Sequence, residues 1–310
     1  MDDLVVLFGG GGFLGRYVAQ ELLRMGARVR VAERDPTDAY FLKPLGGLGQ
    51  TQFVAADVTK PESMRRAVQG ASAVINLVGI LKGKFQAVHV AGARNVAEAA
   101  AAAGAGALVQ ISAIGADAAA ASAYAKSKGE GEAAVRAAFP GATIIRPSTL
   151  FGAEDGFVNR FAQMIALAPV MPVIRSDVRF QPAWVVDVAR AIAMAALDPA
   201  AFGGKTFELG GPQALSMGEL NAWIADAIGR KTHLIALPDA LGGMMARFGF
   251  LPGAPITWDQ WLMLQHDNVV APGAAGFDAF GIDPAPLAAV APRWLVRYRK
   301  HGRFSLSPSA

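Results

Sequence analysis

Cysteine is absent from the 310 residues of this chain. Its absence excludes disulfide bonds, thiolate nucleophiles and metal centres with cysteine ligands. Histidine is scarce, and none of the four histidines has the spacing of a zinc-binding helix, so no metal site is expected. They are His89, His233, His266 and His301.

Charged residues are also few, at 17% of the chain, whereas the hydrophobic set makes up 53%. This balance excludes an intrinsically disordered protein. The longest apolar stretch without charge, residues 99–116, is near the lower length limit of a membrane span. It contains Gln110, Ser112 and the helix-breaking residues 104–106, so we expect the end of a helix followed by a strand. The N-terminus lacks the basic and apolar regions of a signal peptide, and export is not expected.

Acidic residues are missing after Asp283, where five basic residues fall within residues 293–303. This C-terminal segment also carries aromatic side chains and suits an anionic membrane surface, although a solvated basic tail is an equal alternative. No recognition motif accompanies the charge, so nucleic acid is not an expected partner. The basic residues are Arg293, Arg297, Arg299, Lys300 and Arg303.

Short apolar runs alternate with helix-length segments over the first 147 residues. Strands are expected at 4–8, 28–32, 51–55, 72–78, 107–112 and 142–147, and helices at 13–26, 61–70, 85–104 and 122–139. Alternating strands and helices with short connections predict an α/β fold with a doubly wound parallel sheet, the Rossmann type.

The pattern becomes irregular after Pro147, where proline and glycine are frequent. We therefore expect residues 1–146 to form the nucleotide-binding domain. Residues 147–310 are expected to form a smaller, partly interleaved C-terminal lobe, in which 184–198 return to pack on the sheet.

A glycine-rich stretch, FGGGGFLGR at residues 8–16, joins the first strand to the first helix. Such a loop turns sharply, brings bare backbone close to a pyrophosphate and packs the helix on the strand, while the helix N-terminus faces the phosphates. The strand–loop–helix context makes this a dinucleotide site. Two registers fit, because either Gly9 or Gly10 can begin the motif; the expected contacts are Gly9, Gly12, Phe13, Leu14 and Gly15.

The end of the second strand predicts the choice of cofactor. Glu33 would bind the 2′-hydroxyl of NAD(H), and Arg34 would pair with the 2′-phosphate of NADP(H). Adjacent strand residues point in opposite directions, so one of them faces the ribose. We favour Arg34 and NADP(H) over NAD(H). Other strand ends are expected to border the cofactor, with Asp57 and Val58 at the adenine, Val78 and Gly79 at the nicotinamide, and Pro147 after the sixth strand.

Five segments together resemble the short-chain dehydrogenase/reductase superfamily, in its extended or atypical branch. They are the glycine loop, VAADV (54–58), INLVG (75–79), YAKSK (124–128) and VVDVA (185–189).

Three later segments, 139–162, 180–192 and 203–212, are similar to the NADPH-binding accessory subunits of respiratory complex I and their bacterial relatives. That resemblance implies a tightly held NADPH, complex I subunits as partners, and no turnover of its own. It places the protein in the cytoplasm of a bacterium, peripheral on the inner membrane.

Tyr124 and Lys128 lie four residues apart and therefore share a helix face. An ammonium group beside the phenol is expected to lower the tyrosine pKa from its ordinary value near 10. Tyr124 could then exchange a proton with a substrate oxygen during hydride transfer, and Lys128 could bind the nicotinamide ribose. Ser112, after the fifth strand, is the candidate to orient that oxygen.

The resemblance also reveals departures. Extended-family epimerases carry a hydroxyl pair after the fifth strand and a glycine after the tyrosine, whereas this chain has Ser112–Ala113 and Ala125. Three readings stay open: a docked NADP(H)-binding subunit, an NADP-dependent reductase, dehydrogenase or epimerase-like enzyme acting on a small hydrophobic substrate, and a soluble NADP-sensing regulator. The apolar segment 241–264 and the basic C-terminus favour docking, and the Ser–Tyr–Lys set favours an enzyme.

Overall fold

The computed structural model describes residues 3–251 and 253–304, which fall into two compact units. The first takes its residues from Met1–Pro147, Val185–Leu209 and Pro272–Asp283. The second takes its residues from Ser148–Trp184, Gly210–Ala271 and Pro284–Ala310.

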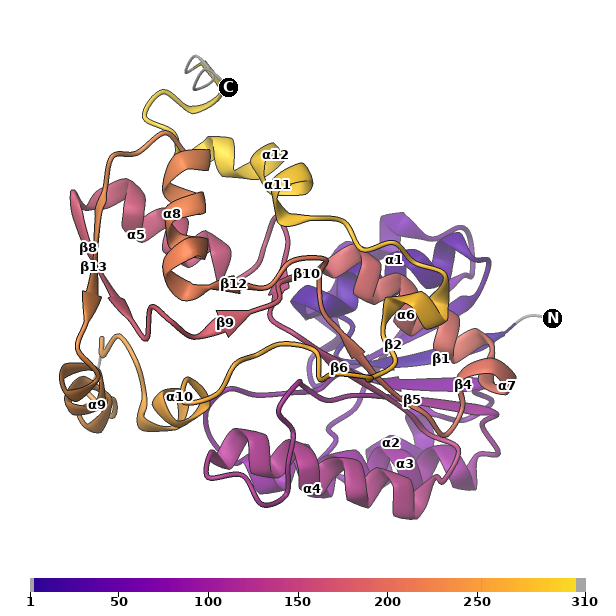
Figure 1. The fold of residues 1–310 in the computed structure, drawn as a ribbon. Helices are drawn as coiled ribbons and strands as arrows, with labels where there is room; N and C mark the ends of the chain where they lie inside the picture. The colour runs from indigo at the N-terminus through magenta and orange to yellow at the C-terminus, as the bar shows by residue number, and fades with distance from the viewer. Residues whose placement is uncertain (1–2, 252, 305–310) are drawn as a thin grey trace. The chain divides into compact units, whose positions relative to one another are not determined.

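A seven-stranded parallel sheet forms the centre of the first unit, with the strand order β11-β6-β5-β4-β1-β2-β3 (Figure 1). This confirms the predicted doubly wound sheet, since the chain runs outward from β1 in one direction and then returns to β4 to run in the other. The strands are β1 (Leu4–Phe8), β2 (Arg28–Glu33), β3 (Thr51–Ala55), β4 (Ala73–Asn76), β5 (Ala107–Ile111), β6 (Thr143–Pro147) and β11 (Thr206–Leu209).

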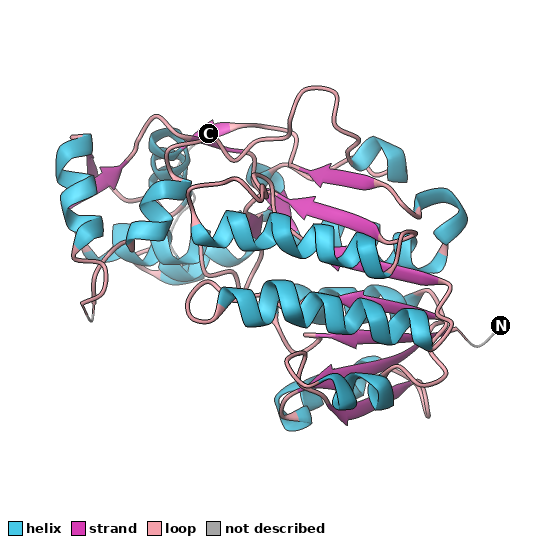
Figure 2. Cartoon of the chain, turned by 90° about the horizontal axis from the view of Figure 1, so that it is seen from below, coloured by secondary structure: helices cyan, strands magenta, loops and turns pink. Residues whose placement is uncertain are grey.

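Helices cover both faces of this sheet, with α1 and α6 on one side and α2, α3 and α4 on the other (Figure 1). Figure 2 shows helices lying in front of the parallel strands. The helices are α1 (Phe13–Arg24), α2 (Pro61–Ala67), α3 (Ala93–Ala102), α4 (Ala123–Ala138), α6 (Val185–Leu197) and α7 (Pro199–Phe202), with 3-10 helices η1 (Pro36–Leu45) and η3 (Phe277–Phe280) and the π-helix η2 (Gln86–Gly92).

The core beneath α3 explains why alanine is abundant in that helix. Ala97 and Ala100 are buried beside Val96, and they pack in one cluster with strand residues such as Val74 and Leu108. Small side chains let the helix approach the sheet closely, while each large side chain that is fully buried contributes about 1.5–3 kcal/mol.

Three elements of this unit differ from the sequence-based expectation. The seventh strand, β11, was not predicted; it pairs with β6 and follows the returning helix α6. The 3-10 helix η1 was not predicted either. The single helix expected at 85–104 is divided, because its first part is the π-helix η2 and α3 begins at Ala93.

The second unit is built on short strand pairs and helices around its own core. The pairs are β8 (Val170–Ile174) with β13 (His233–Leu237), β7 (Leu150–Phe151) with β10 (Ala183–Trp184), and β9 (Arg179–Phe180) with β12 (Leu215–Ser216). Its helices are α5 (Val158–Leu167), α8 (Met217–Ala227), α9 (Asp239–Arg247), α10 (Trp258–Met263), α11 (Leu287–Val290) and α12 (Pro292–Leu295), followed by 3-10 helices η4 (Val296–Tyr298) and η5 (Gly302–Phe304). Among the described residues, no helix combines the length and apolarity that crossing a membrane requires.

Candidate functional site

The loops at the carboxyl ends of β1 and β4 meet at the middle of the sheet. These two strands are neighbours, and their following helices cover opposite faces. A Cβ atom placed on Gly9, directly after β1, would lie 3.3 Å from the backbone nitrogen of Val78, after β4. Ligands of doubly wound sheets bind in the crevice at this switch point.

Three glycines of the glycine loop have different structural roles. Gly9 has φ +82°, which a glycine adopts without strain and which starts the turn. Gly12 is the exposed N-cap of α1, and a Cβ atom there would meet little besides the Gly9 oxygen at 3.3 Å. Gly15 is buried, and its Cβ atom would lie 2.3 Å from the same oxygen. The positive φ of Gly9 favours the register Gly9–Gly12–Gly15, although Gly10 also has no room for a side chain, with Val31 at 2.8 Å.

The start of α1 fits a pyrophosphate. Phe13 and Leu14 form its first turn, and Gly12 supplies no side-chain cap for it. The first N–H groups of a helix lack partners within the helix and carry the positive end of its dipole. The bare Gly12 leaves them open to an anion, and the residues present match the dinucleotide that the sequence predicts.

The two candidate readers of the adenosine ribose lie in different surroundings. The Gly11 backbone N–H donates to Glu33 Oε1 at 2.6 Å, so the carboxylate is turned into the glycine loop. Burial raises the pKa of Glu33 above its ordinary value, and the bond from Gly11 opposes that rise. Arg34 is exposed, and its positive charge acts to lower the pKa of both Glu33 and Asp57.

The predicted adenine and nicotinamide contacts lie on the next two strand ends. Asp57 accepts hydrogen bonds from Thr59 N and Oγ1, which lower its pKa, and Val58 is buried. After β4, the Val78 N–H donates to Asn76 Oδ1 at 3.1 Å. Gly79 is exposed beside it.

Pro147 ends β6, where its carbonyl accepts from the Ile114 N–H at 3.2 Å. This bond attaches the connection after β5, which begins at Ser112, to the end of the neighbouring strand. The Pro147 side chain is buried. At this edge of the sheet Pro147 therefore acts through its backbone carbonyl and not through an exposed side chain.

Lys128 is buried on α4, and its Nζ donates to the Ile111 carbonyl at 2.9 Å, at the end of β5. A Cβ atom on Gly79 would lie 3.6 Å from the same nitrogen. The ammonium therefore reaches the strand ends of both β4 and β5. Burial lowers the pKa of Lys128 to about 8, against the opposing effect of Glu132.

Tyr124 corrects one expectation. We expected Lys128 to lower the tyrosine pKa, but burial raises the pKa of Tyr124 to about 12. The ring packs edge-on against Phe85 and His89, with centroids 6.1 Å and 5.6 Å away. The phenol therefore keeps its proton at neutral pH and can donate a hydrogen bond, but it is a poor base.

Ser112 lies at the end of β5, and its Oγ is buried without a hydrogen-bond partner among the described residues. A buried hydroxyl usually finds a partner, and an unsatisfied one costs about 1–3 kcal/mol. The unpartnered Ser112 hydroxyl could therefore form a hydrogen bond with an oxygen atom of a bound ligand.

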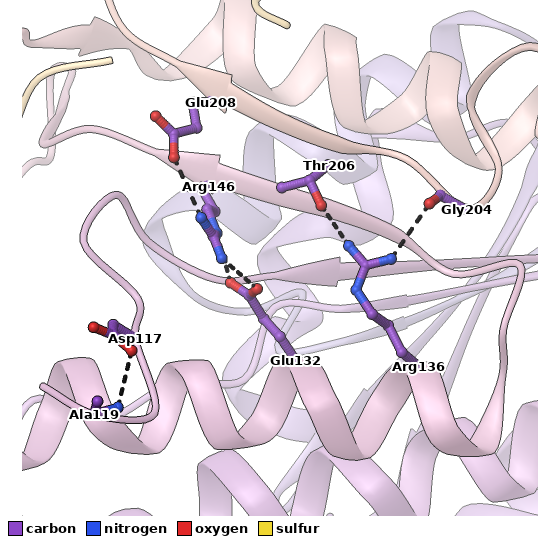
Figure 3. A network of polar contacts seen from close by, with 8 residues as sticks. All are labelled: Asp117, Ala119, Glu132, Arg136, Arg146, Gly204, Thr206 and Glu208. Atoms are coloured by element: carbon purple, nitrogen blue, oxygen red, sulfur yellow. Dashed lines mark hydrogen bonds and ion pairs between the residues drawn. The ribbon is translucent and has the colours of Figure 1, made fainter. Parts of the chain in front are cut away.

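An ion-pair network that the sequence did not predict holds α4 on the sheet (Figure 3). Arg146 on β6 binds Glu132 of α4 through two nitrogens at 2.8 Å and 2.7 Å, and it reaches Glu208 of β11 at 3.3 Å. One turn further along α4, Arg136 donates to Thr206 and to the Gly204 carbonyl. Because Glu132 lies one turn after Lys128, this network helps fix the position of the lysine.

The second unit carries a separate candidate surface on α9 and the residues that follow it. Leu241, Met244, Phe248 and Leu251 follow one another at helical spacing and are exposed, Phe248 to 56% and Met244 to 52%. The opposite side of α9 is made of small residues, because a Cβ atom on Gly242 would lie 2.7 Å from the Trp261 ring. We call these four residues the α9 stripe. Three of them border a hollow of about 350 Å³ lined mainly by apolar residues, Met244, Met245, Phe248, Leu251, Gly253, Ala254 and Pro255.

Comparisons with known proteins agree with this fold. Residues 5–210 match the NAD dependent epimerase/dehydratase family. A rat protein, NADH dehydrogenase (ubiquinone) 1 alpha subcomplex subunit 9, is 34% identical over 307 residues, which cover 96% of this chain and 81% of that protein. Ceramide reductase of Caulobacter vibrioides is 33% identical over 241 residues, covering 76% and 74% of the two chains.

Among solved structures, an NADPH-dependent quinone oxidoreductase of Escherichia coli has the same fold, with a TM-score of 0.77 at 22% identity, over 94% of this chain and 99% of that one. The predicted resemblance is confirmed, and with it a nicotinamide dinucleotide as the class of cofactor. The chain therefore belongs to the NAD dependent epimerase/dehydratase family, in the group that contains the alpha subcomplex subunit 9 proteins.

Proposed function

We propose that this protein is an NADP(H)-holding accessory subunit of a respiratory NADH:ubiquinone oxidoreductase complex. The observation that carries the proposal is the similarity, along 96% of the chain, to proteins named as subunits of that complex. The similarity covers the second unit as well as the nucleotide-binding unit. It therefore supports docking on the complex as well as dinucleotide binding.

In this proposal the cofactor is NADP(H), held by the first turn of α1 at its pyrophosphate and by Arg34 at its 2′-phosphate. Two features support the choice: Glu33 is already bound to Gly11, and the neighbouring guanidinium is exposed. Lys128 and Tyr124 would line the nicotinamide ribose. When bound, the cofactor would supply a nicotinamide able to transfer a hydride. The residues around the cofactor would bind it without catalysing its oxidation or reduction.

Docking would use the second unit. The α9 stripe is an exposed apolar surface of a kind that monomeric proteins seldom leave uncovered. The basic C-terminus, with no acid after Asp283, suits the anionic headgroups of a membrane surface. Together they support a peripheral position on the cytoplasmic face of a bacterial inner membrane, beside the complex.

A second candidate is an NADP-dependent reductase of a small hydrophobic substrate. Two observations favour it: the orphaned Ser112 hydroxyl beside the buried Lys128, and a relative named ceramide reductase. Against it, the phenol pKa of about 12 makes Tyr124 a weak proton-transfer group near neutral pH, and Ala113 replaces the second hydroxyl of the family pattern.

The test follows NADPH oxidation by the isolated protein over a panel of carbonyl and quinone compounds. The docked-subunit proposal expects no steady turnover, and it expects Tyr124→Phe to leave complex assembly and quinone reduction intact. Steady turnover that falls roughly 10²–10⁴-fold in Tyr124→Phe would instead identify a reductase with Tyr124 as its acid.

A further inference from the structure

His89 lies at the centre of the π-helix η2, which leads into α3. π-helical turns are rare and are found frequently at functional sites. This one is confined on two sides, because a Cβ atom on Gly131 of α4 would lie 2.2 Å from the His89 carbonyl oxygen and one on Gly92 would lie 2.9 Å from Val58. The packing fixes the backbone of His89 directly against the helix that carries Tyr124 and Lys128.

Both ring nitrogens of His89 make hydrogen bonds. The Ile80 backbone N–H donates to Nε2 at 2.9 Å, and Nδ1 lies 2.8 Å from Ser127 Oγ. A backbone N–H can only donate, so Nε2 must be the unprotonated nitrogen and Nδ1 carries the proton. Ser127 Oγ accepts that proton and donates its own to the Tyr124 carbonyl at 2.8 Å. The contacts therefore define one tautomer, with Nδ1–H.

The ring is neutral as well as oriented. It is 3% exposed, and burial together with the Lys128 ammonium lowers the pKa of His89 to about 4. Phe85 stacks on it at a centroid distance of 5.4 Å, and the Tyr124 ring meets it edge-on. A neutral imidazole keeps its Nε2 lone pair available to the Ile80 N–H at physiological pH.

We propose that His89 is a positioning residue that clamps the loop after β4 to α4, and so sets the gap in which the nicotinamide half of the cofactor is held. The loop in question is Val78–Ile80, in which a Cβ atom on Gly79 would lie 3.6 Å from Lys128 Nζ. The clamp runs from Ile80 through the imidazole and Ser127 to the backbone of Tyr124. The role rests on the proposed function, since a nicotinamide is what this gap would contain.

Two substitutions separate the halves of the clamp. In His89→Gln the amide oxygen can replace Nε2 as the acceptor for Ile80, whereas in His89→Asn the shorter amide can replace only Nδ1 as the donor to Ser127. Amide hydrogen exchange at Ile80 is measured first, in the cofactor-free protein. His89→Asn should speed it roughly 5- to 150-fold, because the partly buried Ile80 donor is left unsatisfied, while His89→Gln should remain close to wild type.

Cofactor binding is measured next, with NADPH and with 2′,5′-ADP, which lacks the nicotinamide. His89→Asn should weaken NADPH binding about fivefold or more and change the fluorescence of the bound nicotinamide, and leave 2′,5′-ADP binding unchanged. His89→Gln should restore both NADPH signals. Equal behaviour of the two variants, or an equal loss of 2′,5′-ADP, would overturn the positioning role.

A measurement on the unmodified chain covers the case in which a variant does not fold. Nitrogen chemical shifts should report His89 as the Nδ1–H tautomer, and an Nε2–H tautomer would overturn the clamp. Failure of wild-type protein to bind NADPH would overturn the proposed function and the cofactor role of His89 together. Failure of the exchange and tautomer results alone, with NADPH still bound, would overturn only the clamp.

Discussion

Replacing Gly12 with valine should weaken cofactor binding without unfolding the protein. The new side chain would be tolerated after a small shift, because a Cβ atom at Gly12 would make one tight contact, with the Gly9 oxygen at 3.3 Å. The residue is exposed with φ −75°, so there is open space beyond that contact. The same open space is the place assigned to the pyrophosphate. A branched side chain there should keep the dinucleotide from approaching the backbone of the loop.

The expected size of the effect follows from the cost of forcing a group into an occupied space, about 1–3 kcal/mol. That cost corresponds to about 5- to 150-fold in the dissociation constant of NADPH. The free energy of unfolding of the cofactor-free protein should change by much less, since the substitution touches no packed side chain.

Gly15→Ala is the matched variant, three residues further along the same loop. Its Cβ atom would lie 2.3 Å from the Gly9 oxygen and 2.6 Å from Gly10 Cα, both backbone atoms. The helix must move, so this smaller substitution should lower the free energy of unfolding by about 1–3 kcal/mol. It should lower the melting temperature by roughly 2–4 °C for each kcal/mol.

Isothermal titration with NADPH and urea unfolding of the cofactor-free protein distinguish the two variants. Gly12→Val should lose affinity and keep its stability, and Gly15→Ala should lose stability. Retained NADPH affinity in Gly12→Val would refute the position assigned to the pyrophosphate. Unchanged stability in Gly15→Ala would refute the close packing of α1 on the loop.

Three further outcomes are expected. Arg34→Ala should weaken NADPH binding by about 1.5–3 kcal/mol and leave NADH binding unchanged, as measured by titration with both nucleotides; an unchanged NADPH affinity would transfer the role to Glu33. In the cofactor-free protein, Lys128 binds fewer protons when folded than when unfolded between pH 8 and 10.5, so its contribution to the free energy of unfolding rises with pH across that window. Lys128→Met should remove this rise, as measured by urea unfolding at several pH values. Identical pH profiles of wild type and Lys128→Met would contradict the burial of Lys128. Arg146→Met removes the guanidinium that pairs with two largely buried carboxylates, and should lower the free energy of unfolding by about 3–5 kcal/mol, whereas a neutral result would show that the network of Figure 3 is not structural.

The sheet and glycine loop were predictable because their signals are local. The apolar run 4–8 followed directly by glycines indicates a buried strand that leads into a dinucleotide loop, and the structure places β1 at those residues. The same reasoning located Tyr124 and Lys128 on one helix. The register of the glycines could not be chosen in this way, because it depends on the backbone torsions of the folded loop, such as the positive φ of Gly9.

The remaining features depend on contacts between distant residues. β11 exists as a sheet strand because residues 206–209 return to pair with β6, some 60 residues earlier in the chain. The pKa of Tyr124 was predicted in the wrong direction because burial raises it. Two of the rings packed against the phenol, Phe85 just before η2 and His89 within it, come from more than 30 residues earlier in the chain. Nothing in the sequence indicated a role for His89, because its contacts with Ile80 and Ser127 form only in the folded chain.

The most direct test of a docked, NADP(H)-holding subunit is native size analysis of gently solubilised membranes with in-gel NADH oxidation. The wild-type chain should migrate with the large NADH-oxidising complex and carry NADPH. Phe248→Ser, in the α9 stripe, should release the chain from the complex. Leu48→Ser, which changes another apolar and fully exposed residue outside the stripe, should leave the chain bound to the complex. Migration of the wild-type chain at its own size, free of the complex, would contradict the account.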